Sequence, residues 1–325
     1  MSGTRIVCAG RKLPEFAVTN EDLTSLVDTS DEWIHTRSGI KTRFISRGET
    51  VSDLSSDVLR QLLSKSGDAP GDIEFLVLAT LTAEYATPQS SALILGEVNA
   101  KNAFAIDING ACTGFVYALS IADKMIRSGV YKNAVVISAD TLSKVVDWSD
   151  RTTCVLFGDG AGGVLLEAVE GGSSCILAED LHTDGQDALL LRGGRTPINN
   201  PWNEDKGPTE PYIVMDGHAV YDFTIREVPK SAQSVLDKAG LTVDDVKYII
   251  PHQANARIIE KIAKKLKADI SKFYISISRY GNTSSSSIPI ALSEMFEQGL
   301  LEKGDKVILA GFGAGFTWGC LLVEI

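Results

Sequence analysis

The sequence has few cysteines, and none of them forms a close pair. Its 325 residues include five widely scattered cysteines with no C-x-x-C spacing: Cys8, Cys112, Cys154, Cys175 and Cys320. An odd number at these spacings argues against a disulfide framework and against a zinc site. We therefore expect each cysteine to be a buried structural residue unless its surroundings indicate otherwise.

Long apolar runs and positive charge are also scarce. No stretch approaches the roughly 18 apolar residues of a membrane span, and the first residues lack the basic and apolar regions of a secretory signal. The 31 basic residues are outnumbered by 42 acidic ones, for a formal net charge of −11. This balance disfavours nucleic acid, which requires clustered positive charge. We expect a cytoplasmic protein on which an acidic partner docks only at a local basic patch.

The hydrophobic pattern indicates an α/β fold. Hydrophobic residues make up 44% of a chain long enough for about two domains. Short β-branched runs alternate with amphipathic segments, as in folds with parallel strands. Helices are expected to begin after Asn20 and Ser52, and Gly185–Pro211 is expected to be a long surface loop. The predicted strands are Thr4–Ala9, Ile73–Ala79, Ala103–Ile108, Ala134–Ala139, Val246–Ile250 and Lys306–Ala310.

A weak internal repeat underlies this alternation. The run that starts at Asp72 (DIEFLV) matches the run that starts at Asp245 (DVKYII), an offset of 173 residues (245 − 72). Two further matches have offsets of 172 and 173 residues. We interpret them as two similar βα halves, residues 1–170 and 171–325. This register pairs Cys112 with a position near residue 285, close to Asn282.

Cys112 is the cysteine whose surroundings suggest chemistry. It lies in Asp107-Ile-Asn-Gly-Ala-Cys-Thr-Gly-Phe, between a predicted strand and a predicted helix over Thr113–Ser128. The positive end of the helix dipole favours the thiolate, which is the nucleophilic form. The flanking glycines permit a sharp turn that exposes the sulfur. These features favour a nucleophile over a small buried cysteine at a tight turn.

Two polar residues in the second half are further candidates. His252 follows a predicted strand in Pro251-His-Gln-Ala-Asn, at the strand edge where parallel sheets carry their sites. Asn282 opens Tyr280-Gly-Asn-Thr-Ser, ahead of a predicted helix. The simpler alternatives are a hydrogen-bonded structural histidine and a helix-capping asparagine. The repeat predicts that Asn282 faces Cys112.

Two glycine-rich segments, Phe157–Gly163 and Gly311–Gly319, are not phosphate loops. Neither contains G-x-x-x-x-G-K-[ST], and strand-like residues follow each of them. These glycines are better explained by close approach of the backbone to neighbouring groups. Such an approach also directs a backbone N–H into the candidate site. Cysteine, histidine and asparagine together in an α/β protein suggest acyl transfer through a thioester.

The whole chain resembles the β-ketoacyl-acyl-carrier-protein synthase III family of condensing enzymes. The motifs that carry the resemblance occur in order: Thr29-Ser-Asp-Glu-Trp-Ile, Gly110-Ala-Cys-Thr-Gly-Phe, Asp150-Arg151 with Phe157-Gly-Asp-Gly-Ala-Gly, Pro251-His-Gln-Ala-Asn, Gly281-Asn-Thr-Ser and Gly311-Phe-Gly-Ala-Gly-Phe-Thr-Trp-Gly. The resemblance implies a thiolase-like fold in which two pseudo-symmetric βα halves form a layered α/β/α/β/α core. It also implies a homodimer.

The resemblance further implies a reaction. An acyl-CoA primer, expected to be acetyl-CoA, condenses with malonyl-acyl carrier protein and loses CO₂. The products are 3-oxoacyl-acyl carrier protein and CoA, and the reaction initiates fatty acid synthesis without a metal or cofactor. By resemblance, Cys112 carries the acyl group, and the backbone N–H groups of Cys112 and Ala314 form an oxyanion hole. His252 and Asn282 then donate hydrogen bonds to the malonyl thioester oxygen.

Substrate-binding residues carry over in the same way. Ordinary core or surface roles are the alternatives for Trp33, Arg37 and Arg151. The implied CoA contacts are Trp33 and Arg151 at the adenine, Arg37 near the phosphates, and Gly217, Ala254 and Asn255 along the pantetheine.

The segment Ala254–Lys267 predicts an amphipathic helix with a basic side. We interpret that side as a docking surface for the acidic helix of acyl carrier protein, against the simpler alternative of a solvated charged face. Its four cations are Arg257, Lys261, Lys264 and Lys265.

Three positions depart from the family pattern. His218 stands where many relatives have Asn or Arg, and Asp222 occupies a position that is basic in some relatives. Thr87 replaces a Phe that, in several relatives, crosses the dimer interface and closes the primer pocket. The smaller side chain predicts a pocket that admits longer or branched primers.

Six other functions compete with this one. An acyltransferase of the same fold, or a starter enzyme of a secondary-metabolite pathway, keeps the architecture and changes the reaction. A degradative thiolase would need a second cysteine in Gly311–Gly319, which has none, and an elongating enzyme a second histidine where Asn282 stands. A Cys-dependent α/β-hydrolase would place its histidine last. A non-catalytic scaffold would form no acyl-enzyme.

Overall fold

The first half of the chain forms a five-stranded sheet. The computed structural model describes residues 2–204 and 207–325. Strands β4 and β5 run parallel to each other, and β6 runs parallel to β4, whereas β7 is antiparallel to both β6 and β1. The mixed sheet corrects the expectation of parallel strands alone. In spatial order its strands are β1 (Gly3–Lys12), β7 (Gly160–Val169), β6 (Asn133–Asp140), β4 (Phe75–Ala79) and β5 (Phe104–Ile108).

The second half forms a four-stranded sheet with the same arrangement. Its spatial order is β11 (Tyr248–Pro251), β12 (Lys306–Gly313), β13 (Thr317–Glu324) and β8 (Ile176–Thr183). Strands β4, β6 and β1 begin 173 residues before β11, β12 and β8 respectively. The register inferred from weak sequence matches is therefore the register of the fold. The division of the chain into domains at residue 170 stays a prediction.

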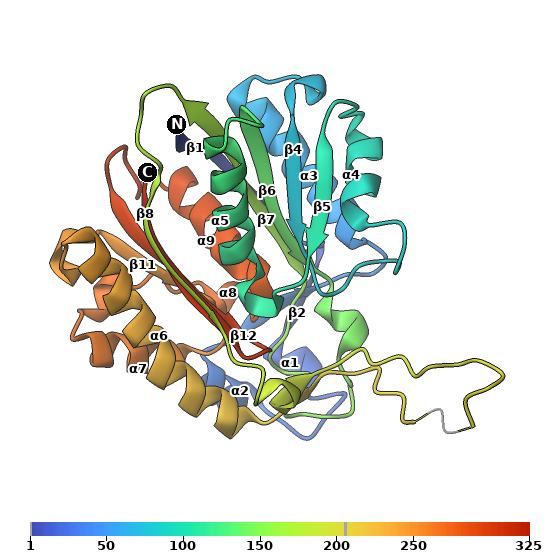
Figure 1. Ribbon diagram of the computed structural model, residues 1–325. Coiled ribbons are helices and arrows are strands. Elements are labelled where there is room, and N and C mark those ends of the chain that lie inside the picture. The colour runs from blue at the N-terminus through green and yellow to red at the C-terminus, as the bar shows by residue number, and fades with distance from the viewer. Residues whose placement is uncertain (1, 205–206) are drawn as a thin grey trace.

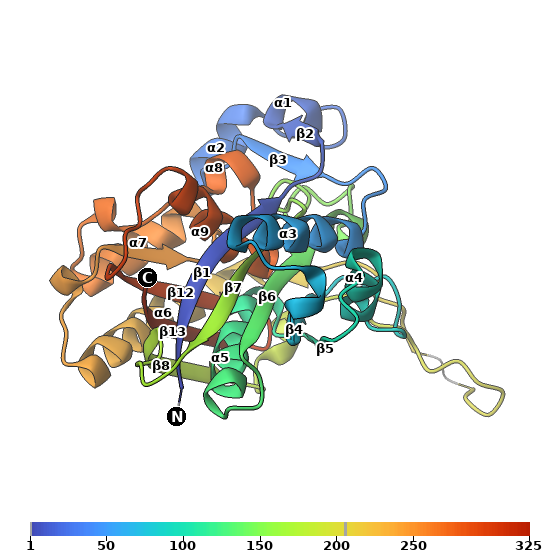
Figure 2. The same cartoon turned by 90° about the horizontal axis from the view of Figure 1, so that it is seen from above.

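Helices complete five layers. In Figure 1, α5 (Gly114–Arg127) and α9 (Ser287–Glu297) lie between the two sheets. Helices α3 (Val51–Ser66) and α4 (Ser90–Val98) cover the outer face of the first sheet (Figure 2), and α6 (Gly217–Ala239) and α7 (Ala256–Leu266) cover that of the second. The central core joins side chains of both halves, for example Phe115 with Leu292. This is the layered α/β/α/β/α core of the thiolase-like fold.

Several helix starts differ from those predicted. Thr19 and Thr50 cap α1 (Asn20–Leu23) and α3, each in a reciprocal capping box with an aspartate three residues later. The predicted caps Asn20 and Ser52 lie inside these helices. Asn20 instead accepts a hydrogen bond from the buried guanidinium of Arg43 at 2.8 Å.

Smaller elements lie beside the two main sheets. Strands β2 (Phe16–Thr19) and β3 (Thr42–Ile45) form a ribbon beside α2 (Asp31–Ser38) and α8 (Ile277–Tyr280). The predicted loop over 185–211 contains the short strand β9 (Leu191–Arg192), which pairs with β10 (Val214–Met215). Beyond β9 the chain extends away from the body of the molecule (Figure 1).

The described part of the chain has no helix with both the length and the apolar character needed to cross a membrane. Within the same residues, no group of three or more His, Cys, Asp or Glu side chains is placed to hold a metal ion. The five cysteines are free thiols.

Candidate active site

Cys112 lies in a tight turn between β5 and α5. The 3-10 turn Ala111–Thr113 precedes α5, and Ala111 adopts a left-handed φ of 45°. The predicted helix therefore starts at Gly114 rather than Thr113. A Cβ built at Gly313 would lie 2.8 Å from the Cβ of Cys112. Glycine at this position lets the turn between β12 and β13 approach the thiol.

The ionisation of Cys112 differs from the expectation. Its side chain is half-buried, and the surrounding protein raises the pKa of the thiol to about 12, mainly by desolvation. The buried carboxylate of Asp140 raises it further, whereas the hydroxyl of Ser284 lowers it. Desolvation therefore opposes the thiolate form that the helix terminus favours.

His252 lies directly after β11 and is 1% exposed. Its backbone N–H donates to Ala310 O at 2.8 Å, and its Nδ1 lies 2.8 Å from Ser287 Oγ. The ring stands edge-on to Phe312, with centroids 5.1 Å apart. Burial lowers the pKa of His252 to about 3, so the imidazole is neutral at physiological pH.

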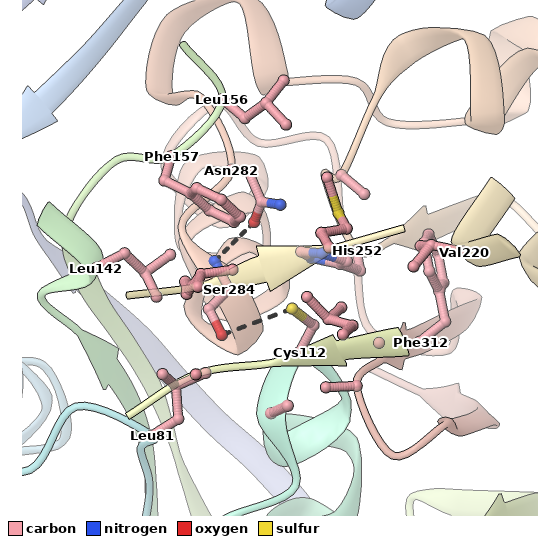
Figure 3. Close-up of a pocket in the computed structure, with 18 of the residues that line it drawn as sticks. Leu81, Cys112, Leu142, Leu156, Phe157, Val220, His252, Asn282, Ser284 and Phe312 are labelled. Atoms are coloured by element: carbon pink, nitrogen blue, oxygen red, sulfur yellow. Dashed lines mark hydrogen bonds between the residues drawn. The ribbon is translucent and has the colours of Figure 1, made fainter. Parts of the chain in front are cut away.

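Asn282 is fixed by both its backbone and its side chain. Its N–H donates to Leu156 O at 2.9 Å, and its C=O accepts from Gly158 N at 2.9 Å. Its Oδ1 accepts the Ser284 N–H at 2.9 Å. Because that partner is a backbone donor, the amide orientation is determined and Nδ2 remains as the donor. Figure 3 shows the Asn282 nitrogen on the side of the amide that does not face Ser284.

The three predicted residues line one cavity of about 410 Å³. Cys112 comes from the first half and His252 and Asn282 come from the second, and Figure 3 shows the three side chains grouped at the centre of the view. The remaining wall is largely apolar and includes Leu81, Leu142, Phe157 and Ile213. Four other predicted site residues also line it: Gly217, Ala254, Asn255 and Ala314.

The predicted adenine and phosphate residues gather beside this cavity, outside its wall. The guanidinium carbons of Arg37 and Arg151 lie 4.5 and 5.0 Å from the ring centroid of Trp33, within the range of a cation–π interaction. Arg151 also donates to Asp28 O at 2.7 Å. Asn255 Nδ2 donates to Arg37 O at 3.0 Å and so connects the group to the cavity.

The predicted carrier-protein surface is exposed. Helix α7 buries its isoleucines, and the opposite side carries four exposed cations without ion pairs to described residues: Arg257, Lys261, Lys264 and Lys265.

None of the three positions that depart from the family pattern lines the cavity of the single chain. Thr87 is exposed and does not line the cavity of the single chain, whereas Leu81 of the same segment does. His218 is in the first turn of α6, where its N–H donates to the capping Asp216. Asp222 is exposed on the same helix.

Among the cavity residues that were not predicted, two contact Cys112 or His252. Ser284 Oγ lies 3.7 Å from Cys112 Sγ (Figure 3), and Phe312 packs against His252. The repeat pairs Cys112 with residue 285. Because Ser284 directly precedes that residue, the repeat is a signal that could have indicated a position near the thiol for Ser284. Nothing in the local sequence distinguishes Ser284 from the serines that follow it.

Comparison with known proteins decides the family. A model described as 3-oxoacyl-[acyl-carrier-protein (ACP)] synthase III matches residues 106–185, and a model of its C-terminal part matches residues 236–325. The β-ketoacyl-[acyl-carrier-protein] synthase III of Streptococcus uberis is 46% identical over 327 residues, covering all of both chains. The chain belongs to the β-ketoacyl-acyl-carrier-protein synthase III family. It is an acyltransferase, a condensing enzyme that initiates fatty acid synthesis.

Solved structures agree with this assignment. The 3-oxoacyl-[acyl-carrier-protein] synthase III of Aquifex aeolicus is 41% identical, with a TM-score of 0.92 over 99% of this chain and 100% of that one. The priming β-ketosynthase of the R1128 polyketide pathway is 32% identical, with a TM-score of 0.91 over 99% of this chain and 96% of that one. An α/β-hydrolase is excluded, because the two pseudo-symmetric sheets are those of the thiolase-like fold.

Proposed function

We propose that this enzyme condenses an acyl-CoA primer with malonyl-acyl carrier protein, releasing CoA and CO₂ and forming 3-oxoacyl-acyl carrier protein. The observation that carries the proposal is the meeting of Cys112, His252 and Asn282 in one cavity. A thiol supplies a nucleophile for a thioester carbonyl, and two neutral hydrogen-bond donors supply an oxyanion site.

In the first half-reaction, the Cys112 sulfur attacks the primer thioester and CoA leaves as the thiol. The tetrahedral oxygen takes hydrogen bonds from the backbone N–H groups of Cys112 and Ala314. Both residues line the cavity, and Gly313, directly before Ala314, lets the two backbones come together. Such preorganised donors stabilise the developing charge without reorganisation.

In the second half-reaction, malonyl-acyl carrier protein loses CO₂ and the resulting enolate attacks the acyl-enzyme. Asn282 donates from Nδ2, since Oδ1 is already bonded to Ser284 N. His252 donates from Nε2 when Ser287 gives its hydroxyl proton to Nδ1, which lies 2.8 Å away. A neutral imidazole suits this role because a donor, rather than a proton source, is required.

The substrates enter from the side of α2 and α7. Trp33, Arg37 and Arg151 form an aromatic and cationic group suited to the adenine and phosphates of CoA. Gly217, Ala254 and Asn255 continue along the cavity toward Cys112, as the pantetheine requires. The exposed cations Arg257, Lys261, Lys264 and Lys265 on α7 bind the acidic carrier protein.

The proposal also covers the preferred primer, the oligomeric state and the cellular location. The enzyme is a cytoplasmic homodimer, and Thr87 faces the primer only when a second subunit brings it to the neighbouring cavity. Its small side chain admits primers longer than acetyl or branched at the end. A kinetic panel in which only acetyl-CoA is accepted would reject the wider pocket.

Intact mass spectrometry tests the reaction. After mixing with acetyl-CoA and longer acyl-CoAs, we expect a mass increase of one acyl group, absent in Cys112→Ala. Malonyl-acyl carrier protein should then discharge the acyl group and release CO₂. Discharge without CO₂ would instead indicate plain acyl transfer to an acceptor.

A starter enzyme of a secondary-metabolite pathway is the second candidate. The 32% identity to the R1128 priming β-ketosynthase, over nearly the whole of both chains, is the observation that favours it. The same primer panel separates the two functions, because strong preference for an unusual primer over acetyl-CoA would support the starter enzyme.

A further inference from the structure

Gln253 is a buried polar residue of the Pro251-His-Gln-Ala-Asn motif that the proposed reaction leaves without a role. It directly follows His252 and is 1% exposed. Its neighbours on both sides, His252 and Ala254, line the cavity, whereas Gln253 does not. Its side chain therefore touches no substrate in the cavity, and any part that it takes in the reaction is indirect.

The side-chain amide of Gln253 makes all four of the hydrogen bonds that such an amide can form. Its Oε1 accepts from Ser276 N at 2.8 Å and from Ile277 N at 3.1 Å. Its Nε2 donates to Pro251 O at 2.7 Å and to Tyr274 O at 3.1 Å. Because all four partners are backbone groups, the orientation of the amide is determined. The amide thus joins two segments of the chain.

One of these segments leads to Asn282. The N–H groups at the start of a helix have no partner within the helix, and Gln253 accepts two of them at the start of α8. In the last turn, Gly281 N donates to Ile277 O at 2.9 Å, and Asn282 follows directly. Gln253 therefore fixes the short helix that precedes the second proposed donor.

The other segment carries His252. The hydrogen bond to Pro251 O holds the end of β11, one residue before His252. The backbone N–H of Gln253 also donates to Ser287 Oγ at 3.2 Å, and this oxygen lies 2.8 Å from His252 Nδ1. The hydroxyl of Ser287 keeps its own proton for Nδ1, so Nε2 remains as the donor.

We propose that Gln253 is a positioning residue that holds His252 and Asn282 at the separation needed to bind one thioester oxygen. Both donors belong to the same cavity (Figure 3), and the amide of Gln253 joins the segments that carry them. An oxyanion site is effective because its donors are already in place when the charge develops. The proposal rests on the proposed roles of His252 and Asn282 in the malonyl half-reaction.

Cys112 lies outside this arrangement. All hydrogen bonds described for Gln253 reach residues of the second half, whereas Cys112 belongs to the first. The primer half-reaction, as proposed, uses the backbone N–H groups of Cys112 and Ala314. Loss of the Gln253 amide should therefore slow decarboxylation of the malonyl group far more than acylation of the thiol.

Two variants of Gln253 test the proposal. Gln253→Met has a side chain of similar length and volume but loses all four amide hydrogen bonds. Gln253→Glu keeps the two bonds to α8 and loses only the donor to Pro251 O and Tyr274 O. The matched control is Gln61→Met, which removes a half-buried amide that binds the backbone of Arg11 on β1. Thermal unfolding is measured for each variant to confirm that it folds.

Rapid-quench kinetics measures two steps separately, acylation of Cys112 by acetyl-CoA and release of CO₂ from malonyl-acyl carrier protein by the acylated enzyme. Gln253→Met should slow CO₂ release about 10- to 100-fold, since misplacement of a group by about 1 Å has an effect of this size. KM for malonyl-acyl carrier protein should stay close to the wild-type value, because the lost interaction belongs to the transition state. Gln253→Glu should show a smaller loss of the same kind, and Gln61→Met should change neither step.

Double variants separate positioning from a structural role. Gln253→Met is combined with His252→Ala and, separately, with Asn282→Ala. A residue that acts through a donor has less to position once that donor is absent, so the loss due to Gln253→Met should shrink in each combination. A residue that only stabilises the fold lowers CO₂ release by the same factor in every background.

Three outcomes would overturn the positioning role. They are equal losses in acylation and CO₂ release, unchanged CO₂ release in folded Gln253→Met, and an undiminished loss in both double variants. If Gln253→Met does not fold, the same criteria apply to Gln253→Glu. Failure of the proposed function is visible separately, because His252→Ala and Asn282→Ala would then release CO₂ at the wild-type rate.

Discussion

Two corresponding turns of the two halves have similar backbone conformations but carry side chains with different roles. The turn Ala111–Thr113 precedes α5, and the turn Ser284–Ser286 precedes α9, each opening with a left-handed residue. The first carries Cys112 toward the cavity. At the equivalent position, Ser285 is buried and its hydroxyl bonds to Ser138. One half thus presents a nucleophile, while the other uses the same geometry for packing.

The strands behind these turns differ in a complementary way. Gly313 at the end of β12 corresponds to Asp140 at the end of β6 (313 − 140 = 173). The glycine leaves space for Cys112, whereas the aspartate fills the equivalent place with a buried carboxylate. The two paired positions therefore have different roles: Gly313 gives the thiol room, whereas Asp140 accepts hydrogen bonds from Thr80, Leu81 and Thr82.

Replacing the paired residues Cys112 and Ser285 with alanine tests the difference between the two turns most directly. Cys112→Ala should lower condensation by roughly 10⁴-fold or more, because no other group forms the acyl-enzyme. Ser285→Ala should keep its activity and lose only some stability, since it removes one buried hydrogen bond. Steady-state rates and thermal unfolding measure both effects. Comparable activity losses in the two variants would contradict the assignment.

The Asn282→Ala variant tests the catalytic contribution of the second half. Loss of the Nδ2 donor should slow the decarboxylating half-reaction by roughly 10²- to 10³-fold, the usual effect of removing one oxyanion-hole donor. Acylation by acetyl-CoA should change far less, because its oxyanion uses backbone donors. Rapid-quench measurement of acylation and of CO₂ release separates the steps, and equal losses in both would be against this division.

The spacing between the halves is tested by Gly313→Ala. The added Cβ would lie 2.8 Å from the Cβ and 3.2 Å from the sulfur of Cys112, so the thiol must move. We expect acylation to slow about tenfold to a hundredfold, as misplacement of a reacting group by about 1 Å does. Gly96→Ala is the matched control, because nothing lies within 4 Å of its added Cβ. Unchanged acylation in Gly313→Ala would show that the turn accommodates the added Cβ without displacing the thiol.

The sequence predicts the periodic and local features of this molecule well. Six strands agree with prediction to within about three residues, and His252 was recognisable from its place after a strand. The contact of Ser284 with Cys112 joins residues 172 positions apart, which no local pattern encodes. The desolvation that raises the pKa of Cys112 is hidden from the sequence for a related reason. The helix terminus can be inferred from spacing, whereas the desolvation that opposes it depends on the packed second half.

The smallest expected effect concerns the outer surface, where the second half bears a basic side on an acidic protein. Lys261→Glu in the middle of α7 is preferable to changes at Lys264 or Lys265, because cations in the last turn also stabilise the helix. We expect KM for malonyl-acyl carrier protein to rise about 3- to 5-fold, in line with at most about 1 kcal/mol for an exposed charge. The effect should shrink with added salt. Lys303→Glu, an equally exposed reversal outside α7, is the control for net charge. If both variants weaken carrier-protein use alike, the overall charge of the protein is responsible, and α7 has no special role in docking.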